Sequence, residues 1–368
     1  MGKVNNTIDI VNYIRQNASE NYKKLVGFIN YGDDISELSN PIMEYTPVRN
    51  EFVEGLTNMI GKTIFTKLNE FKNPLAILKK GESPLGLDIR EIATDLISAT
   101  KYDLSNEGIA EALKLAPPVM EECIHRVNRQ EKYQITVSNA ELRLAMTSWS
   151  DLEQLIVTKS QILYASNYRD EFEYTKKLLR DTVQRGYVEL VEVDEVTGLD
   201  TSDDFVIAVK DIVKEFSYPS TLHNQLYNMD GDKTITSWCA PEDTYLVIPS
   251  NIMNRIEVKS LAVAFNRDDK SFNSNKVEVD DLGFIRTGEE GSYKYYSLDG
   301  MVFDKAFTQI YDDLLELWEM ELSSIMAWNR FLHVWQIFST SSFVNVVALV
   351  HEVQESDIPE GYFDTDGE

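Results

Sequence analysis

The hydrophobic pattern between Trp149 and Gly186 predicts one long helix, because neither glycine nor proline falls between these two positions. Ser150 followed by Glu153 has the spacing of a capping box, and Gly186 suits the left-handed position that ends many helices. The apolar residues of this stretch recur at helical spacing but do not keep a heptad register. The pattern therefore favours a helical spine packed within a larger fold over a coiled-coil dimer.

Shorter patterns on either side of this helix mix strands with helices. We predict strands at 133–137, 187–196, 245–248 (closed by Pro249) and 343–350, and helices at 206–216, 251–265 and, rich in aromatic residues, 303–338. A polar stretch at 266–281 predicts a surface loop, and the acidic residues after Glu352 predict a solvated or flexible tail. Since these elements do not alternate as βαβα units, the predicted fold class is α+β.

The region before the long helix predicts extended segments. Residues 8–29 have helical spacing, after which Pro41 and Pro47 favour an extended arm; an ordinary first helix packed on the domain is an equal alternative. Residues 71–90 carry two prolines and two glycines, which suits a projecting hairpin or long loop, with helical sequence around 89–114. This loop region is locally basic, with six bases and three acids between Lys62 and Arg90.

The whole chain, in contrast, is strongly acidic. Among 368 residues, 61 Asp and Glu stand against 35 Lys and Arg, giving a formal charge of −26. Such a surface repels nucleic acid, so any DNA contact must be local or indirect. The hydrophobic content of 43% is enough for a large core. The longest apolar run, 346–350, is far short of a membrane span, which predicts a protein without membrane contact.

Catalytic signatures are not evident in the sequence. Residues 228–232 superficially suggest a calcium loop, but Lys233 and Cys239 replace its required glycine and glutamate, so we interpret the segment as a turn. Cys123, Cys239 and the four histidines show no metal-ligand spacing, and we expect reduced, packed thiols and no cofactor. The cluster 125–129, with His125, Arg126 and Arg129, is either a solvated turn or an anchor for an acidic neighbour.

The order of these parts resembles the Hong Kong 97-type fold of tailed-phage major capsid proteins. Several stretches are also similar to the major head proteins of small short-tailed, phi-twenty-nine-like phages. The resemblance covers roughly residues 50–350 and rests on NPLAILKKGESPLGLDIREI (73–92), HRVNRQEKYQITVSNAELRLAM (125–146), DEFEYTKKLL (170–179), FDKAFTQIYDDLLELWE (303–319) and WNRFLHVWQIFSTSSFVNVVALV (328–350).

The resemblance implies a non-enzymatic structural protein that self-assembles, as pentamers and hexamers, into an icosahedral head enclosing double-stranded DNA without sequence-specific binding. Implied partners are a scaffolding protein, a portal and cement proteins, with assembly in the host cytoplasm and a final location in the virion. The implied parts are an N-terminal arm (1–55), an extended loop and return strand (56–146), a spine helix with the start of the peripheral domain (147–200), a mainly axial domain (201–345), and a closing strand with an acidic tail (346–368).

The extended loop would lie across a neighbouring subunit, and its basic residues would then contact an acidic surface. The expected inter-subunit contacts are Lys72, Lys79, Lys80, Arg90, His125, Arg126 and Arg129. Two other functions stay open at this point. One is another head component, such as a portal or inner-core protein, and the other is an acidic cytosolic hydrolase that uses a carboxylate pair.

Overall fold

The computed structural model describes residues 7–63, 73–83, 88–99, 117–229, 235–256, 275–288, 292–322, 324–325 and 327–363. The chain divides into two compact units, which are described separately. Unit 1 comprises residues 1–73, 128–171 and 312–336, and unit 2 comprises residues 74–127, 172–311 and 337–368. Within the described ranges, no helix is both long and apolar enough to cross a membrane.

The predicted long helix is confirmed as α7, Trp149–Gln184. Its N-terminus differs from the prediction, because Ser148 rather than Ser150 caps it: the Asp151 N–H donates to Ser148 Oγ at 3.1 Å. At the other end Gly186 has a φ of +77°, the left-handed conformation that glycine adopts without a steric cost. The helix belongs to unit 1 up to Glu171 and to unit 2 from Phe172.

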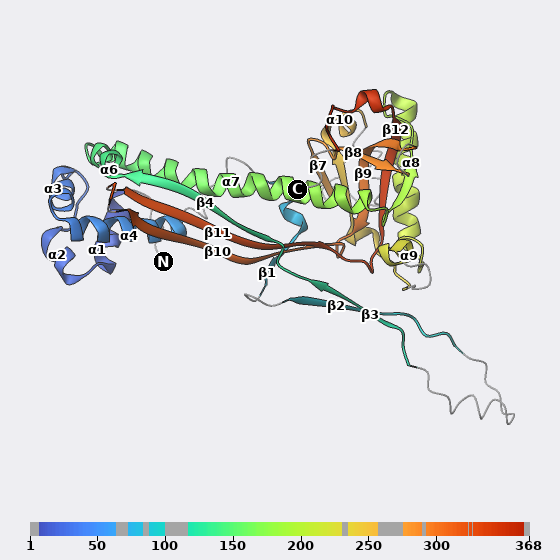
Figure 1. Cartoon of the computed structure of the whole chain (residues 1–368), viewed down its shortest axis with the longest axis horizontal. Helices are drawn as coiled ribbons and strands as arrows, with labels where there is room; N and C mark the ends of the chain where they lie inside the picture. Colours follow the sequence, from blue (N-terminus) through green and yellow to red (C-terminus); the bar gives the residue numbers. More distant parts are fainter. Residues whose placement is uncertain are drawn as a thin grey trace. The chain divides into compact units, whose positions relative to one another are not determined.

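Unit 1 begins with four helices, labelled in Figure 1: α1 (Thr7–Asn17), α2 (Glu20–Leu25), α3 (Ser36–Glu44) and α4 (Thr46–Thr63). The prediction of an extended arm at Pro41 and Pro47 was therefore wrong. Pro47 lies in the first turn of α4, where a missing N–H leaves no helical hydrogen bond unmade. The helices bury apolar side chains such as Val11, Leu38 and Phe52 in one core with the start of α7.

Strands replace a predicted helix. Residues 303–338 were expected to be mainly helical, but they form the end of β9 (Lys294–Asp304), all of β10 (Thr308–Leu322) and most of β11 (Ala327–Thr340). β11 pairs antiparallel with β4 (Arg129–Ser138), from Ala327 opposite Ser138 to Gln336 opposite Arg129. The sheet has the order β1-β10-β11-β4, in which β1 is Lys79–Glu82. The short helix α6 (Asn139–Ala145) follows β4 through a capping box of Ser138 and Glu141.

Unit 2 is built on a sheet of order β5-β12-β9-β6-β7, with β8 paired to β9. The bounds are β5 Glu189–Glu192, β6 Thr244–Pro249, β7 Lys276–Val279, β8 Phe284–Thr287 and β12 Val346–Val353. Alternate residues face opposite sides, so Leu246 and Val347 pack with helix α8 (Leu199–Phe216), whereas Val247 and Val346 pack with Leu179 of α7. The predictions at 133–137, 206–216 and 245–248 are confirmed by β4, α8 and β6, and the strands predicted at 187–196 and 343–350 are confirmed over 189–192 and 346–350.

Other parts of unit 2 correct the sequence-based expectations. Residues 89–94 form strand β2 rather than helix, and the rest of the expected helix at 89–114 lies largely outside the described residues. The helix expected at 251–265 is described only as α10, Ser250–Met253, and β7 interrupts the expected loop at 266–281. The part of the tail that the structure describes, up to Phe363, has a 3₁₀ turn at Glu355–Asp357. Of the turn predicted at 228–232, the first two residues end helix α9 (Gln225–Met229), and residues 230–232 lie outside the described residues.

Candidate functional site

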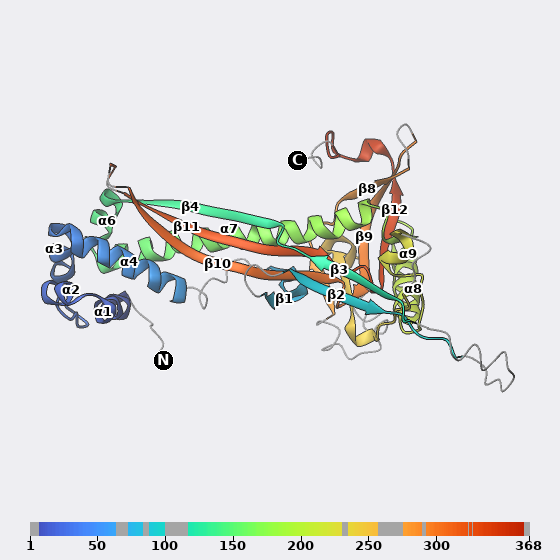
Figure 2. The ribbon, with the colours of Figure 1, turned by 60° about the horizontal axis from the view of Figure 1, so that its bottom comes forward.

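The strands β2 (Ile89–Thr94) and β3 (Met120–His125) form an antiparallel ribbon with two different faces. Figure 2 shows the two strands side by side. Burial alternates residue by residue along both strands, as expected when one face of a ribbon is covered and the other is open. The open face carries Arg90, Ile92, Thr94, Met120, Glu122 and Ile124. The covered face carries Ile89, Glu91, Ala93, Glu121, Cys123 and His125.

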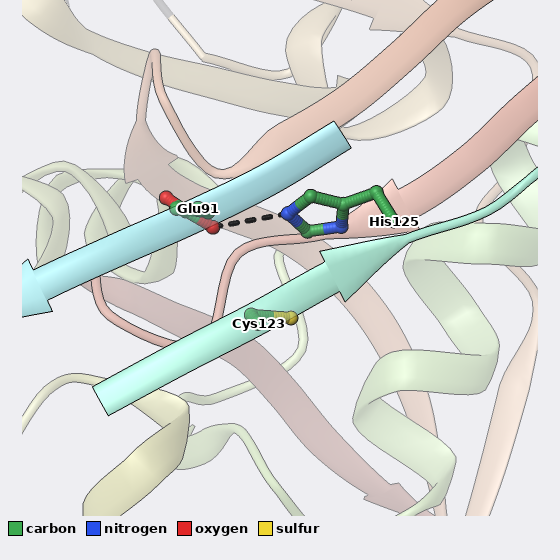
Figure 3. Close-up of side chains that lie close together, drawn as sticks. All are labelled: Glu91, Cys123 and His125. Carbon is green, nitrogen blue, oxygen red and sulfur yellow. Dashed lines mark hydrogen bonds and ion pairs between the residues drawn. The ribbon is translucent and has the colours of Figure 1, made fainter. Parts of the chain in front are cut away.

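A carboxylate, a thiol and an imidazole meet on the covered face. Glu91 lies directly opposite Cys123 in the ladder, and His125 follows two residues later on the same side. Figure 3 shows the three side chains together, with His125 Nε2 3.1 Å from Glu91 Oε2. One donor atom from each of the three residues lies within 4.8 Å of the other two. The antiparallel register therefore creates a cluster that the spacing along the chain does not reveal.

Three serines hold this cluster: Ser339 near the end of β11, and Ser341 and Ser342 just after it. Ser339 Oγ lies 2.8 Å from His125 Nδ1, and Ser341 Oγ donates to Glu91 Oε1 at 2.8 Å. Ser342 forms a side-chain hydrogen bond with Cys123. Burial raises the pKa of the Cys123 thiol, and the negative charge of Glu91 raises it further, so the thiol is protonated at neutral pH.

Apolar packing and one polar contact fix the same face of the ribbon to unit 2. Ala93 and Cys123 pack against a small core formed by Leu226, Ile235 and Phe343. Just beyond β2, Asp95 Oδ1 accepts a hydrogen bond from the Thr236 N–H at 2.9 Å. This backbone hydrogen bond lowers the pKa of Asp95. The base of the ribbon is therefore bound to its own unit, whereas the side chains on its open face are exposed among the residues that the structure describes.

Two of the predicted contact residues form exposed ion pairs. On the open face, Arg90 pairs with Glu122 through two hydrogen bonds, the longer one at 2.7 Å, and this pairing raises the pKa of Arg90. Arg126 Nε lies 3.0 Å from Asp88 Oδ2, with both side chains largely exposed. Exposed pairs of this kind contribute little to folding, so both remain available for contacts with another molecule.

The other predicted residues have different environments. His125 and Arg129 are buried at 1% and 5% exposure, so the interpretation of 125–129 as a solvated turn was wrong for these two residues and holds for the exposed Arg126 and Asn128 between the strands. Arg129 donates to Glu131 at 2.8 Å, to Tyr133 Oη at 2.6 Å and to Gln336, all within unit 1.

The two lysines of β1 do not lie at a loop tip. Lys79 and Lys80 belong to a strand of the four-stranded sheet. The Lys80 ammonium donates to the Lys305 carbonyl oxygen, and its partial burial lowers the pKa of Lys80 although much of the residue is exposed. Lys72 lies outside the described residues.

The fold is that of a phage capsid subunit. The structure superposes on a capsid structure of Staphylococcus phage Andhra with a TM-score of 0.60, at 13% identity, over 77% of this chain and 86% of that chain. A structure titled for the head fiber and inner core protein of bacteriophage P68 gives a TM-score of 0.57, at 12% identity, over 76% and 84%. At these identities the likeness concerns the fold alone, and it is the Hong Kong 97-type fold expected from the sequence.

The sequence comparisons give the family. The profile of the Phi29-like phage major capsid protein matches residues 11–350, and the chain belongs to this family. Major capsid proteins of two Bacillus phages are similar to it: that of phage B103 at 30% identity over 94% of this chain and 73% of the relative, and that of phage GA-1 at 28% over 94% and 70%. The chain is thus a structural subunit of a phage capsid and a component of the virion, rather than an enzyme.

Sequence reasoning missed Glu91 and Cys123 as functional candidates. The two residues are far apart in the chain, and only the antiparallel register of β2 and β3 makes them neighbours. A Cys-x-His pair on a strand was the available signal, because residues two apart on a strand lie on the same face. The sequence did not identify the partner carboxylate, because nothing in it distinguishes Glu91 from the other residues among its 61 Asp and Glu.

Proposed function

We propose that this chain assembles as pentamers and hexamers into an icosahedral head around double-stranded DNA, and that the open face of β2 and β3 binds a neighbouring copy. The single observation that carries this proposal is the apolar character of that face. Ile92, Met120 and Ile124 are 55%, 58% and 46% exposed on it. Beyond the strands, Leu96, Ile97 and Val119 are exposed to 58%, 80% and 54%.

An uncovered group of large apolar side chains is unfavourable in water. Burial of apolar surface contributes roughly 25 cal/mol per Å², so covering several such residues at every copy of a contact favours association. Contiguous exposed apolar surface bordered by charged residues is typical of protein interaction sites. The pair of Arg90 and Glu122 supplies such charges on the same face, which supports a partner that has both apolar and charged groups.

Charge also supports the choice of partner. Lys79, Arg90 and Arg126 lie in or beside the ribbon in a chain of net charge −26, so a second copy presents acidic surface to them. The same net charge disfavours tight binding of the enclosed DNA, in agreement with a shell that contains the genome without recognising its sequence. Assembly in the host cytoplasm, with a scaffolding protein, a portal and cement proteins, belongs to the same proposal. The same proposal includes the division of the chain into five parts, 1–55, 56–146, 147–200, 201–345 and 346–368.

The test replaces Ile92 in the full-length chain co-expressed with its phage's scaffolding protein. Ile92→Asp puts a charge on the open face, and we expect the variant to fold with the wild-type circular dichroism spectrum yet yield at least about tenfold fewer shells and capsomers. Ile92→Val keeps an apolar side chain at the same place and should assemble normally. Particles are counted by negative-stain microscopy and sedimentation velocity. Wild-type particle yield from Ile92→Asp contradicts the assignment of this face.

A further inference from the structure

The Glu91, Cys123 and His125 cluster has the donor chemistry of a metal site. Thiolate, imidazole and carboxylate are the three side-chain ligands that Zn²⁺ takes in proteins, at about 2.3, 2.0–2.1 and 2.0–2.2 Å. We propose that these three side chains bind one divalent cation of the zinc class, with a water molecule as the fourth ligand. The site lies inside unit 2 and does not depend on the proposed contact between copies.

The geometry fits a cation after a small adjustment. Tetrahedral ligands at these bond lengths lie roughly 3.3–3.6 Å apart. His125 Nε2 and Glu91 Oε2 are already 3.1 Å apart, and the sulfur of Cys123 completes a group in which no separation exceeds 4.8 Å. Small side-chain rotations that move the donor atoms by about an ångström therefore place all three at bonding distance from one cation. The paired backbones of β2 and β3 stay in register.

Ser339 and Ser341 supply the supporting hydrogen bonds that metal ligands in proteins usually have. A metal-binding histidine commonly donates its second ring N–H to an oxygen, which fixes the ring and its tautomer. Ser339 Oγ stands 2.8 Å from Nδ1 in this position, which leaves Nε2 to face Glu91. Ser341 binds the outer oxygen of Glu91, so its other oxygen is directed at the histidine. Support of this kind orients both ligands before a cation arrives.

Binding changes the protonation of the cluster in a defined way. Without a cation, His125 Nε2 is hydrogen-bonded to Glu91, Nδ1 is hydrogen-bonded to Ser339, and Cys123 is a thiol. With a cation, Cys123 releases its proton to solvent, Nε2 gives its lone pair to the metal, and the histidine proton resides on Nδ1 and is donated to Ser339. A bound cation would cross-link β2 to β3 directly above the small core that holds the ribbon to unit 2.

The test uses tag-free, full-length chain treated with a chelator and then dialysed. Titration with Co²⁺ should give the near-ultraviolet thiolate-to-cobalt charge-transfer band at one equivalent, and Zn²⁺ should displace the cobalt. Cys123→Ser should lose the band and bind Zn²⁺ at least about 100-fold more weakly. Cys239→Ala, which removes the other thiol from a separate core, should keep both. Ser341→Ala should weaken binding by about tenfold, since outer-shell partners commonly contribute 10- to 100-fold.

A second readout separates ligand loss from unfolding. Zn²⁺ should raise the thermal midpoint of the wild type and of Cys239→Ala but not that of Cys123→Ser, because only a ligand bound to the native state stabilises it. Circular dichroism at low temperature confirms that each variant is folded. The proposal is overturned if the wild type shows no charge-transfer band, or if Zn²⁺ affinity is the same in wild type and Cys123→Ser.

Discussion

His223 Nδ1 lies 2.7 Å from Glu189 Oε2, which ties the segment after α8 to strand β5. The hydrogen bond to Glu189 is the main cause of the raised pKa of His223, and the charge of Glu215 adds to it. His351 on β12 repeats the arrangement, with Nδ1 2.5 Å from Oδ2 of the nearly buried Asp299, and its pKa is raised by that hydrogen bond. Folding therefore favours the charged form of both imidazoles more than the unfolded chain does.

These two histidines predict a loss of stability at alkaline pH. Their folded-state pKa values lie above the ordinary value of about 6.5, so their contribution is fully present below that pH and is lost as the pH rises through the folded-state values. We expect the free energy of unfolding, measured by urea titration, to fall as the pH rises above about 6.5 and through the raised folded-state pKa values. In His223→Gln plus His351→Gln this fall should be smaller. An identical pH profile in the double variant contradicts the assignment.

Helix α7 should not tolerate a break at Leu163. This side chain is 3% exposed and packs in the core of unit 1, and proline at that position removes a helical hydrogen bond and clashes with the preceding turn at a cost of about 3 kcal/mol or more. We expect Leu163→Pro to give no particles and a lower thermal midpoint. Leu163→Met, which nearly conserves the volume, should cost less than about 1.5 kcal/mol and assemble. Normal particles from the proline variant contradict a continuous helix.

At Gly55 of α4, alanine should destabilise the chain, although it usually stabilises a helix relative to glycine. Alanine normally stabilises a helix interior over glycine by about 1 kcal/mol. At this position, however, a Cβ would lie 2.6 Å from Cγ2 of Ile14 in α1, closer than real contacts allow. We expect Gly55→Ala to lower the free energy of unfolding of the chain. Combined with Ile14→Ala, the same change should cost less than the sum of the two single changes, because the clashing methyl group is gone.

Tyr362 should keep the C-terminal tail packed against the rest of unit 2. Its hydroxyl accepts hydrogen bonds from Arg180 at 2.9 Å and from the Phe284 N–H at 3.1 Å, and its ring meets Phe284 edge to face. We expect Tyr362→Ala to make the segment after Glu352 several-fold more susceptible to protease. Tyr362→Phe keeps the ring contact and should have a smaller effect, since a hydrogen bond contributes only about 1 kcal/mol. Equal cleavage rates in all three proteins contradict the docking of the tail.

Local sequence information predicted the elements that depend mainly on local energetics. α7 follows from 36 residues without glycine or proline that lead to Gly186. β6 follows from a short apolar run that ends at Pro249, and all six of its residues are buried. The family resemblance predicted the class of fold and the structural role, because it compares the order of many segments at once. In these cases neighbouring residues carry the signal, and packing reinforces it.

The tertiary structure decided the rest. The Leu- and Glu-rich sequence of β10 has good helix propensity, yet it forms a strand, since pairing in a sheet outweighs a propensity difference of a few tenths of a kcal/mol per residue. The same holds for the site. Glu91 meets Cys123 and His125 only through the register of β2 and β3, and three serines reach them from the end of β11. Contacts between residues so distant in the chain depend on the whole fold, which no local pattern specifies.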